Sequence, residues 1–209
     1  MAEGRSSAHI LDGAWRRVGL SVDGEPFAEH SDVLWLQVGR YFADLRAPWE
    51  AVEPARHLLD AAQAFTGRST YDPPTMTWRH DLDTMPRPPG HEDTARMEHH
   101  GSVLVERGKG YIERWQREAT AGTMESAVAQ RNDPQSGAPL ARLVLVAELA
   151  VAVWAEPAAG GAALAWRRGV WAETDSVGAG ADAGLGLFEA LGALTGGTKT
   201  MAAGWRRAW

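Results

Sequence analysis

Residues 75–83 read TMTWRHDLD, a stretch in which large side chains alternate with polar ones. Successive side chains of a β-strand point to opposite faces, so a period of two puts four of these residues on one face: Met76, Trp78, His80 and Leu82. The other face carries only threonine, arginine and aspartate. The pattern predicts a half-buried strand with a single histidine beside a tryptophan on the inner face of a sheet.

Strand-like segments of this kind recur along the chain, separated by turn signals such as Asp23-Gly24. Short strands at this spacing predict a mainly β fold, an antiparallel barrel of about 8–10 strands. Residues 140–146 and 151–154 are expected to form its closing hairpin. One short helix is expected at residues 54–65, where Pro54 precedes a run rich in alanine and leucine. A weak C-terminal helix is expected at residues 185–191.

The composition divides the chain into three parts. Residues 1–12 are small and polar and are expected to form a flexible N-terminus. Residues 13–175 carry the strand pattern and are expected to form the barrel domain. Residues 176–209 are rich in glycine and alanine, so we expect a segment that is partly helical or flexible.

Charge and composition exclude several classes of function. The 209 residues include 21 basic and 27 acidic ones, and a net charge of −6 argues against non-specific nucleic-acid binding. The N-terminus lacks the apolar core of a secretory signal, and the longest apolar run is too short to span a bilayer as a helix. We therefore expect a cytoplasmic protein, a monomer or a homodimer, without nucleic-acid or membrane partners.

The ten tryptophans are the unusual feature of the composition. Large aromatic side chains bury much area and often line ligand pockets, although a tryptophan-rich core without a ligand is the alternative. The strand pattern turns several aromatic and polar side chains to the barrel interior. The candidate ligand-binding residues are Trp15, Arg17, Trp35, Gln37, Trp78, Tyr111 and Trp115.

Two inward-facing residues are candidates for acid–base catalysis. His80 lies on an apolar face, where loss of water is expected to lower its pKa and keep the ring neutral near neutral pH. Glu113 lies between Tyr111 and Trp115 on one strand face, an environment suited to a general acid or base. The alternative is that Glu113 pairs with a buried arginine such as Arg17 in a structural network.

The sequence does not indicate a metal or a cofactor. Without cysteine there is no thiolate site, and the densest histidine cluster is His99-His100 with Glu98 nearby. Adjacent histidines on a strand point to opposite faces, so they cannot both bind one ion. No glycine-rich phosphate loop and no nucleophile elbow is present. We expect neither a metal nor a cofactor.

Several segments together resemble the calycin-like β-barrel family that includes the fungal Hri protein and uncharacterised bacterial relatives. The matching segments are 15–17 (WRR), 33–37 (VLWLQ), 41–46 (YFADLR), 65–67 (FTG), 77–83 (TWRHDLD), 105–108 (VERG) and 111–115 (YIERW). They follow in order over residues 14–155. The resemblance implies a lipocalin-like barrel with a cavity and contributes no catalytic residues.

Three functions are compatible with these features. The first is binding of a small, largely apolar or aromatic molecule in the interior of a tryptophan-lined barrel. The second is a cofactor-free isomerase, cyclase or hydratase in the same interior, with His80 and Glu113 as acid and base. The third is a structural or protein-binding barrel whose interior is filled by the tryptophans.

Overall fold

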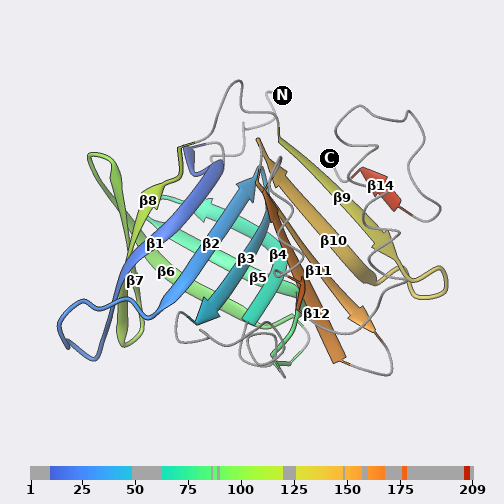
Figure 1. The fold of residues 1–209 in the computed structure, drawn as a ribbon, viewed down its shortest axis with the longest axis horizontal. Coiled ribbons are helices and arrows are strands. Elements are labelled where there is room, and N and C mark those ends of the chain that lie inside the picture. Colours follow the sequence, from blue (N-terminus) through green and yellow to red (C-terminus); the bar gives the residue numbers. More distant parts are fainter. Residues whose placement is uncertain are drawn as a thin grey trace.

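The structure, a computed structural model, describes residues 10–48, 63–85, 87–88, 90–119, 126–147, 149–156, 160–167, 176–177 and 205–207. Eight strands close into an antiparallel barrel in which each strand pairs with its neighbours in sequence and β8 returns to β1 (Figure 1). They are β1 (Gly13–Val22), β2 (Ser31–Val38), β3 (Tyr41–Pro48), β4 (Gln63–Asp72), β5 (Thr75–Asp83), β6 (Glu92–His100), β7 (Val103–Gly108) and β8 (Tyr111–Arg117). This architecture confirms the mainly β fold class.

A second, six-stranded sheet lies beside the barrel (Figure 1). Its strands are β9 (Ser126–Asn132), β10 (Pro139–Val146), β11 (Leu149–Glu156), β12 (Gly160–Arg167), β13 (Ser176–Val177) and β14 (Trp205–Arg207). Strands β10 and β11 do form a hairpin, but the expectation that it closes the barrel is wrong. The barrel is closed earlier, by the pairing of β1 with β8.

The prediction of a helix at residues 54–65 is wrong for residues 63–65, the part of this range that the structure describes. Gln63, Ala64 and Phe65 begin strand β4, and they pair with the end of β3. The high helix propensity of this short run is overridden by pairing with a neighbouring strand, as tertiary context commonly does. Residues 54–62 and the helix expected at 185–191 lie outside the described residues.

Two apolar clusters form the core, one inside the barrel and one between the barrel and the second sheet. The inner cluster contains six buried aromatic side chains together with Met76, Met97 and Leu104; the six are Trp15, Trp35, Phe42, Phe65, Trp78 and Trp115. In the outer cluster, Leu34 and Leu36 of β2 pack against valines of β10 and β11 such as Val144. Because strand side chains alternate, β2 faces the second sheet with one set of residues and the barrel interior with the other.

Strand β5 confirms the expected burial of Met76, Trp78, His80 and Leu82, but Leu82 faces a different core. A β-bulge in the pairing of β4 with β5 interrupts the alternation after His80. Leu82 therefore packs in the outer cluster, and Asp81 reaches Arg142 of β10 at 2.8 Å. Asp83, expected on the solvent face, contacts the His80 ring. The bulge thus gives the histidine an acidic neighbour.

Candidate functional site

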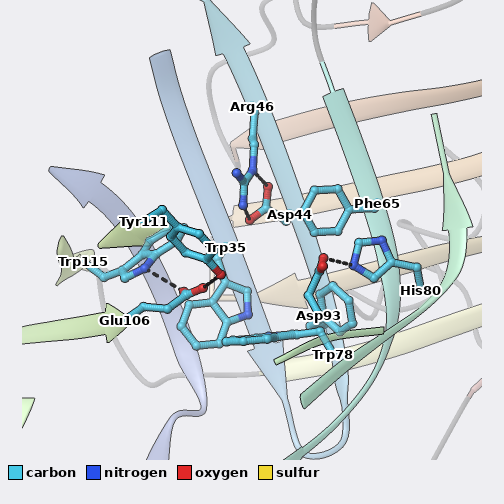
Figure 2. Close-up of a pocket in the computed structure, with 11 residues that line it drawn as sticks. Trp35, Asp44, Arg46, Phe65, Trp78, His80, Asp93, Glu106, Tyr111 and Trp115 are labelled. Carbon is cyan, nitrogen blue, oxygen red and sulfur yellow. Dashed lines mark hydrogen bonds and ion pairs between the residues drawn. The ribbon is translucent and has the colours of Figure 1, made fainter. Parts of the chain in front are cut away.

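A pocket in the barrel interior lies between aromatic side chains and a group of ionisable ones (Figure 2). Its aromatic lining consists of Trp35, Phe42, Phe65, Trp78 and Trp115. The other lining side chains are polar: Asp44, Arg46, His80, Asp93, Glu106 and Tyr111. The pocket has a cavity volume of about 40 Å³, which is space for about three waters. The lining combines an apolar wall with several proton donors and acceptors.

Trp35 is the centre of the aromatic wall. Its ring stacks on Trp15 at a centroid distance of 6.0 Å. It meets Trp78 and Trp115 edge-on at 5.9 Å and 5.6 Å. Stacked and edge-to-face contacts of this kind are the favourable geometries for aromatic rings. The four indoles come from β1, β2, β5 and β8, so the wall connects distant parts of the barrel.

Glu106 of β7 is a buried carboxyl group of the pocket. It accepts hydrogen bonds from the Tyr111 hydroxyl at 2.8 Å and from the Trp115 indole N–H at 3.1 Å. Burial, together with the nearby negative charge of Glu113, raises the pKa of Glu106 to about 8. The carboxyl group can therefore lose or gain a proton near neutral pH.

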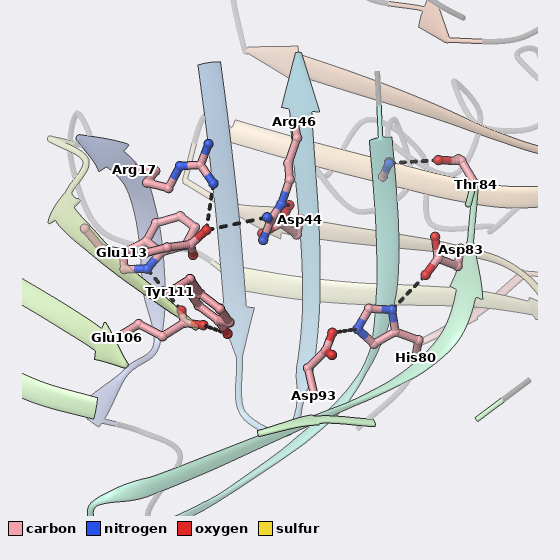
Figure 3. A network of polar contacts seen from close by, with 12 residues as sticks. Arg17, Asp44, Arg46, His80, Asp83, Thr84, Asp93, Glu106, Tyr111 and Glu113 are labelled. Atoms are coloured by element: carbon pink, nitrogen blue, oxygen red, sulfur yellow. Dashed lines mark hydrogen bonds and ion pairs between the residues drawn. The ribbon is translucent and has the colours of Figure 1, made fainter. Parts of the chain in front are cut away.

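A network of buried ion pairs lies beside the pocket (Figure 3). Asp44 and Arg46 of β3 pair at 2.8 Å, as their shared strand face predicts. Arg17 of β1 donates to Glu113 of β8 at 2.6 Å and to Glu29 at 2.7 Å. Arg46 also lies 3.5 Å from Glu113, so the pairs form one connected network.

His80 is held between two carboxylates on the other side of the pocket (Figure 3). Its Nδ1 lies 2.9 Å from Asp83 and its Nε2 lies 3.1 Å from Asp93, while the ring stacks on Phe65 at 4.4 Å. Burial by itself lowers the pKa of His80, but contact with Asp83 and Asp93 raises it above its usual value. The prediction of a lowered pKa for His80 is therefore wrong. The alternation of side chains along one strand does not show that two carboxylates contact the ring. Contact with His80 lowers the pKa of Asp93 to about 2.

The structure brings part of the expected site together. Trp35, Trp78, Tyr111 and Trp115 line the pocket, and so does His80. The other candidates are buried but do not line it: Trp15, Arg17, Gln37 and Glu113.

These four residues have partners within the protein. The Trp15 indole donates to the Leu11 carbonyl at 2.8 Å, and the Gln37 amide donates to the Ser69 hydroxyl at 2.7 Å. Glu113 is engaged by Arg17, which is the structural alternative raised by the sequence.

Sequence reasoning missed Glu106 and Asp93, although a signal for Glu106 was present. The hairpin over Gly108-Lys109-Gly110 sets the register of β7 and β8, and counting back from it pairs Glu106 with Glu113. Residues directly opposite each other on adjacent strands share a face. Asp93 follows a proline-rich loop, so the register between β5 and β6 cannot be counted from the sequence.

Two other kinds of feature are absent from the part of the chain that the structure describes. Among the described residues, no group of three or more histidine, cysteine or acidic side chains is arranged to hold a metal ion. In the same part of the chain, no helix has the length and apolar character needed to cross a membrane.

The closed barrel of eight antiparallel strands in sequence order defines a calycin-like, or lipocalin-like, fold. No family model matches the chain, and no curated protein matches its sequence. The uncharacterized protein YLR301w from Saccharomyces cerevisiae is similar in structure, with a TM-score of 0.56 at 15% identity over 78% of this chain and 82% of that one. A lipocalin-like protein from Bacteroides uniformis matches with a TM-score of 0.39 at 12% identity, over 52% of this chain and 98% of that one.

At these identities the similarity concerns the fold alone, and function has to be argued from the site. The expected lipocalin-like barrel is present, and its interior holds a buried tryptophan cluster. A specific relationship to the fungal Hri protein stays a resemblance in sequence.

Proposed function

We propose that this protein binds a small molecule, largely apolar or aromatic, in the pocket of the barrel. The observation that carries the proposal is that one pocket is lined by both aromatic and ionisable side chains. Ligand pockets typically combine an apolar lining with a few polar groups that fix the orientation of the ligand. In this pocket Trp35, Trp78 and Trp115 would contact the body of the ligand, while Glu106 and His80 would contact its polar atoms.

The size of the pocket limits the ligand. Space for about three waters accommodates a group of a few heavy atoms, so the ligand is a small molecule that inserts such a group, whereas a tetrapyrrole or a long terpenoid is too large for this conformation. A barrel completely filled by its tryptophans would favour the scaffold hypothesis, whereas the space beside Trp35 supports ligand binding.

Titration followed by tryptophan fluorescence tests the proposal. Small aromatic, terpenoid and amine fragments are added to the full chain, and a saturable change in emission is expected for at least one class. Because Trp35 is in ring contact with Trp15, Trp78 and Trp115, a ligand at the pocket alters the environment of connected indoles. If no fragment of any class gives a saturable change in emission, the proposal is overturned.

One observation favours a second function, that of a cofactor-free isomerase, cyclase or hydratase. The pKa of Glu106 is raised to about 8 and that of Asp93 is lowered to about 2, although both line the same pocket. Titratable groups whose environments move their pKa values apart are typical of acid–base sites. Glu106 would then act as the acid and the Asp93–His80 pair as the base, with Glu106 in the role that the sequence suggested for Glu113.

Deuterium exchange tests this second function. Any fragment that binds is incubated with the protein in heavy water, and the loss of its C–H signals is followed by NMR. We expect exchange with the wild type and none above background with Glu106→Gln. Binding of a fragment without exchange of its C–H protons would contradict the second function and leave ligand binding as the function of the pocket.

A further inference from the structure

The pocket contains more carboxyl groups than cations that pair with them. Asp44, Asp93 and Glu106 face one guanidinium, that of Arg46, and one imidazole, that of His80. Asp44 already holds Arg46 at 2.8 Å, and Asp93 lies 3.1 Å from His80. One carboxyl group is left without a cation.

That group is Glu106. Its two hydrogen-bond donors, the Tyr111 hydroxyl and the Trp115 indole, are neutral. None of the ion pairs formed among the described residues includes it. Burial of a carboxylate without an ion-pair partner is unfavourable, which raises the pKa of Glu106 to about 8, and the site lacks an ion-pair partner for the ionised form. A positive charge in the pocket would complete it.

A second observation on the other side of the pocket also points to a ligand. Nε2 of His80 is buried without a well-aligned hydrogen bond, and its contact with the Asp93 carboxylate at 3.1 Å is an ion pair. The side chain of His80 is only 2% exposed, and it lines the pocket. Buried ring nitrogens normally have a hydrogen-bond partner. A polar ligand atom would satisfy this one.

The rings beside Glu106 suit a cation as well. Trp115 donates its N–H to Glu106, and its ring contacts Trp35 at a centroid distance of 5.6 Å. The face of an indole attracts a cation, and quaternary ammonium groups are typically held by several aromatic rings. A trimethylammonium group occupies about the volume of three waters, which is the space that the pocket offers.

We propose that the ligand of this pocket is a small organic cation whose positive charge lies beside Glu106. Its methyl or methylene groups pack against Trp35 and Trp115, and a hydrogen-bonding atom reaches Nε2 of His80. This inference rests on the proposed function, that the pocket binds a small molecule, and adds the charge of that molecule.

Calorimetric titration of the full chain with choline and with 3,3-dimethylbutan-1-ol tests the inference. The second compound has the shape of choline with carbon in place of the charged nitrogen. At about pH 9, where Glu106 is ionised, we expect choline to bind about tenfold more tightly than the alcohol. Glu106→Gln is expected to lower the affinity for choline about tenfold and to leave that for the alcohol unchanged.

Glu98→Gln is the matched control, because Glu98 lies on the outside of the barrel and pairs with Arg107 at 3.2 Å. It changes the net charge by the same amount and should leave the affinity for choline unchanged. An equal loss of affinity for choline in both variants would overturn the inference, since the net charge of the protein, and not a contact with Glu106, would then explain the loss. Thermal unfolding of each variant shows whether it is folded. If a variant does not fold, the comparison of choline with the alcohol on the wild-type protein still tests the inference.

The outcomes separate the two proposals. Equal affinity for choline and the alcohol overturns the cation inference and supports the proposed function. Binding of a neutral aromatic fragment such as indole, with no binding of choline, likewise overturns the cation inference and supports the proposed function. The absence of binding by all three compounds overturns both proposals.

Discussion

Arg17 and Glu113 are joined by a buried ion pair of 2.6 Å that connects the first and last strands of the barrel. Both side chains are almost fully buried, at 5% and 3% exposed. The pair therefore helps to close the barrel, and it engages Glu113, the candidate acid or base for which the sequence also predicted pairing with Arg17. Glu106, its neighbour across the β7–β8 ladder, is the carboxyl group that faces the pocket.

Glu113→Gln is expected to destabilise the protein by about 3 kcal/mol, because it leaves Arg17 and Arg46 without one of their buried carboxylates. Removing this negative charge should also lower the pKa of Glu106, since the charge of Glu113 helps to raise it. Chemical unfolding and NMR titration of Glu106 measure the two effects. An unchanged free energy of unfolding would contradict the structural role of the pair.

The buried Glu106 is expected to make stability depend on pH. Its pKa is about 8 in the folded state, above its ordinary value of 4.5, so the folded protein holds a proton that the unfolded chain releases. Stability therefore falls as pH rises from about 4.5 to 8, by at most about 1.4 kcal/mol per pH unit.

The difference between the wild type and Glu106→Gln isolates this effect from other titrating groups. Urea unfolding of both proteins across the same pH window is expected to show that the variant gains stability relative to the wild type as pH rises. Parallel curves for the two proteins would contradict a raised pKa at Glu106.

Asp83→Asn is expected to lower the pKa of His80. The Asp83 carboxylate accepts from Nδ1 at 2.9 Å and favours the charged ring, whereas burial opposes it. Since the pKa of His80 is raised in the folded state, the charged ring stabilises the wild type at low pH, and this contribution is lost as pH rises through the folded pKa. NMR titration of the ring protons measures the change, and Asp133→Asn in an exposed loop serves as the control.

Gly67→Ala is expected to destabilise the barrel by about 3 kcal/mol or more. A Cβ at this position would lie 1.8 Å from the carbonyl oxygen of Arg79, and a backbone atom cannot move aside as a flexible side chain can. Gly67 pairs with His80 at the bulge, so the substitution should also disturb the histidine.

Gly19→Ala is the matched control for Gly67. Its new Cβ would meet the ring of Phe27 at 3.3 Å, and that ring is partly exposed and free to shift. Thermal unfolding should show a much smaller loss for Gly19→Ala. Similar losses for the two variants would contradict the account of the bulge.

Alternation along the strands predicted which side chains face the interior, because a period of two needs no knowledge of the partners. Trp78 and His80 point inward as expected, and Asp44 pairs with Arg46 on a shared face. The bulge at Gly67 could not be predicted in the same way, because it depends on how β4 pairs with β5. The prediction of a lowered pKa for His80 is wrong partly for this reason, since the bulge supplies Asp83, while the second carboxylate, Asp93, comes from β6.

The boundary between the barrel and the second sheet could not be predicted from the sequence either, for a related reason. Strands β10 and β11 are apolar because they pack on the outside of the barrel, which gives them the composition expected of barrel strands. Only the pairing of β1 with β8 shows that the barrel closes before them.

Occupancy of the pocket between the tryptophan wall and Glu106 can be measured by NMR. The indole N–H resonances are followed while choline or indole is added to the full chain. We expect the resonances of Trp35, Trp78 and Trp115 to move saturably with one of the two compounds. Trp15, which is buried outside the pocket, should move least. Absence of any movement, or movement of Trp15 without the three lining indoles, would contradict the proposal that a ligand occupies the pocket.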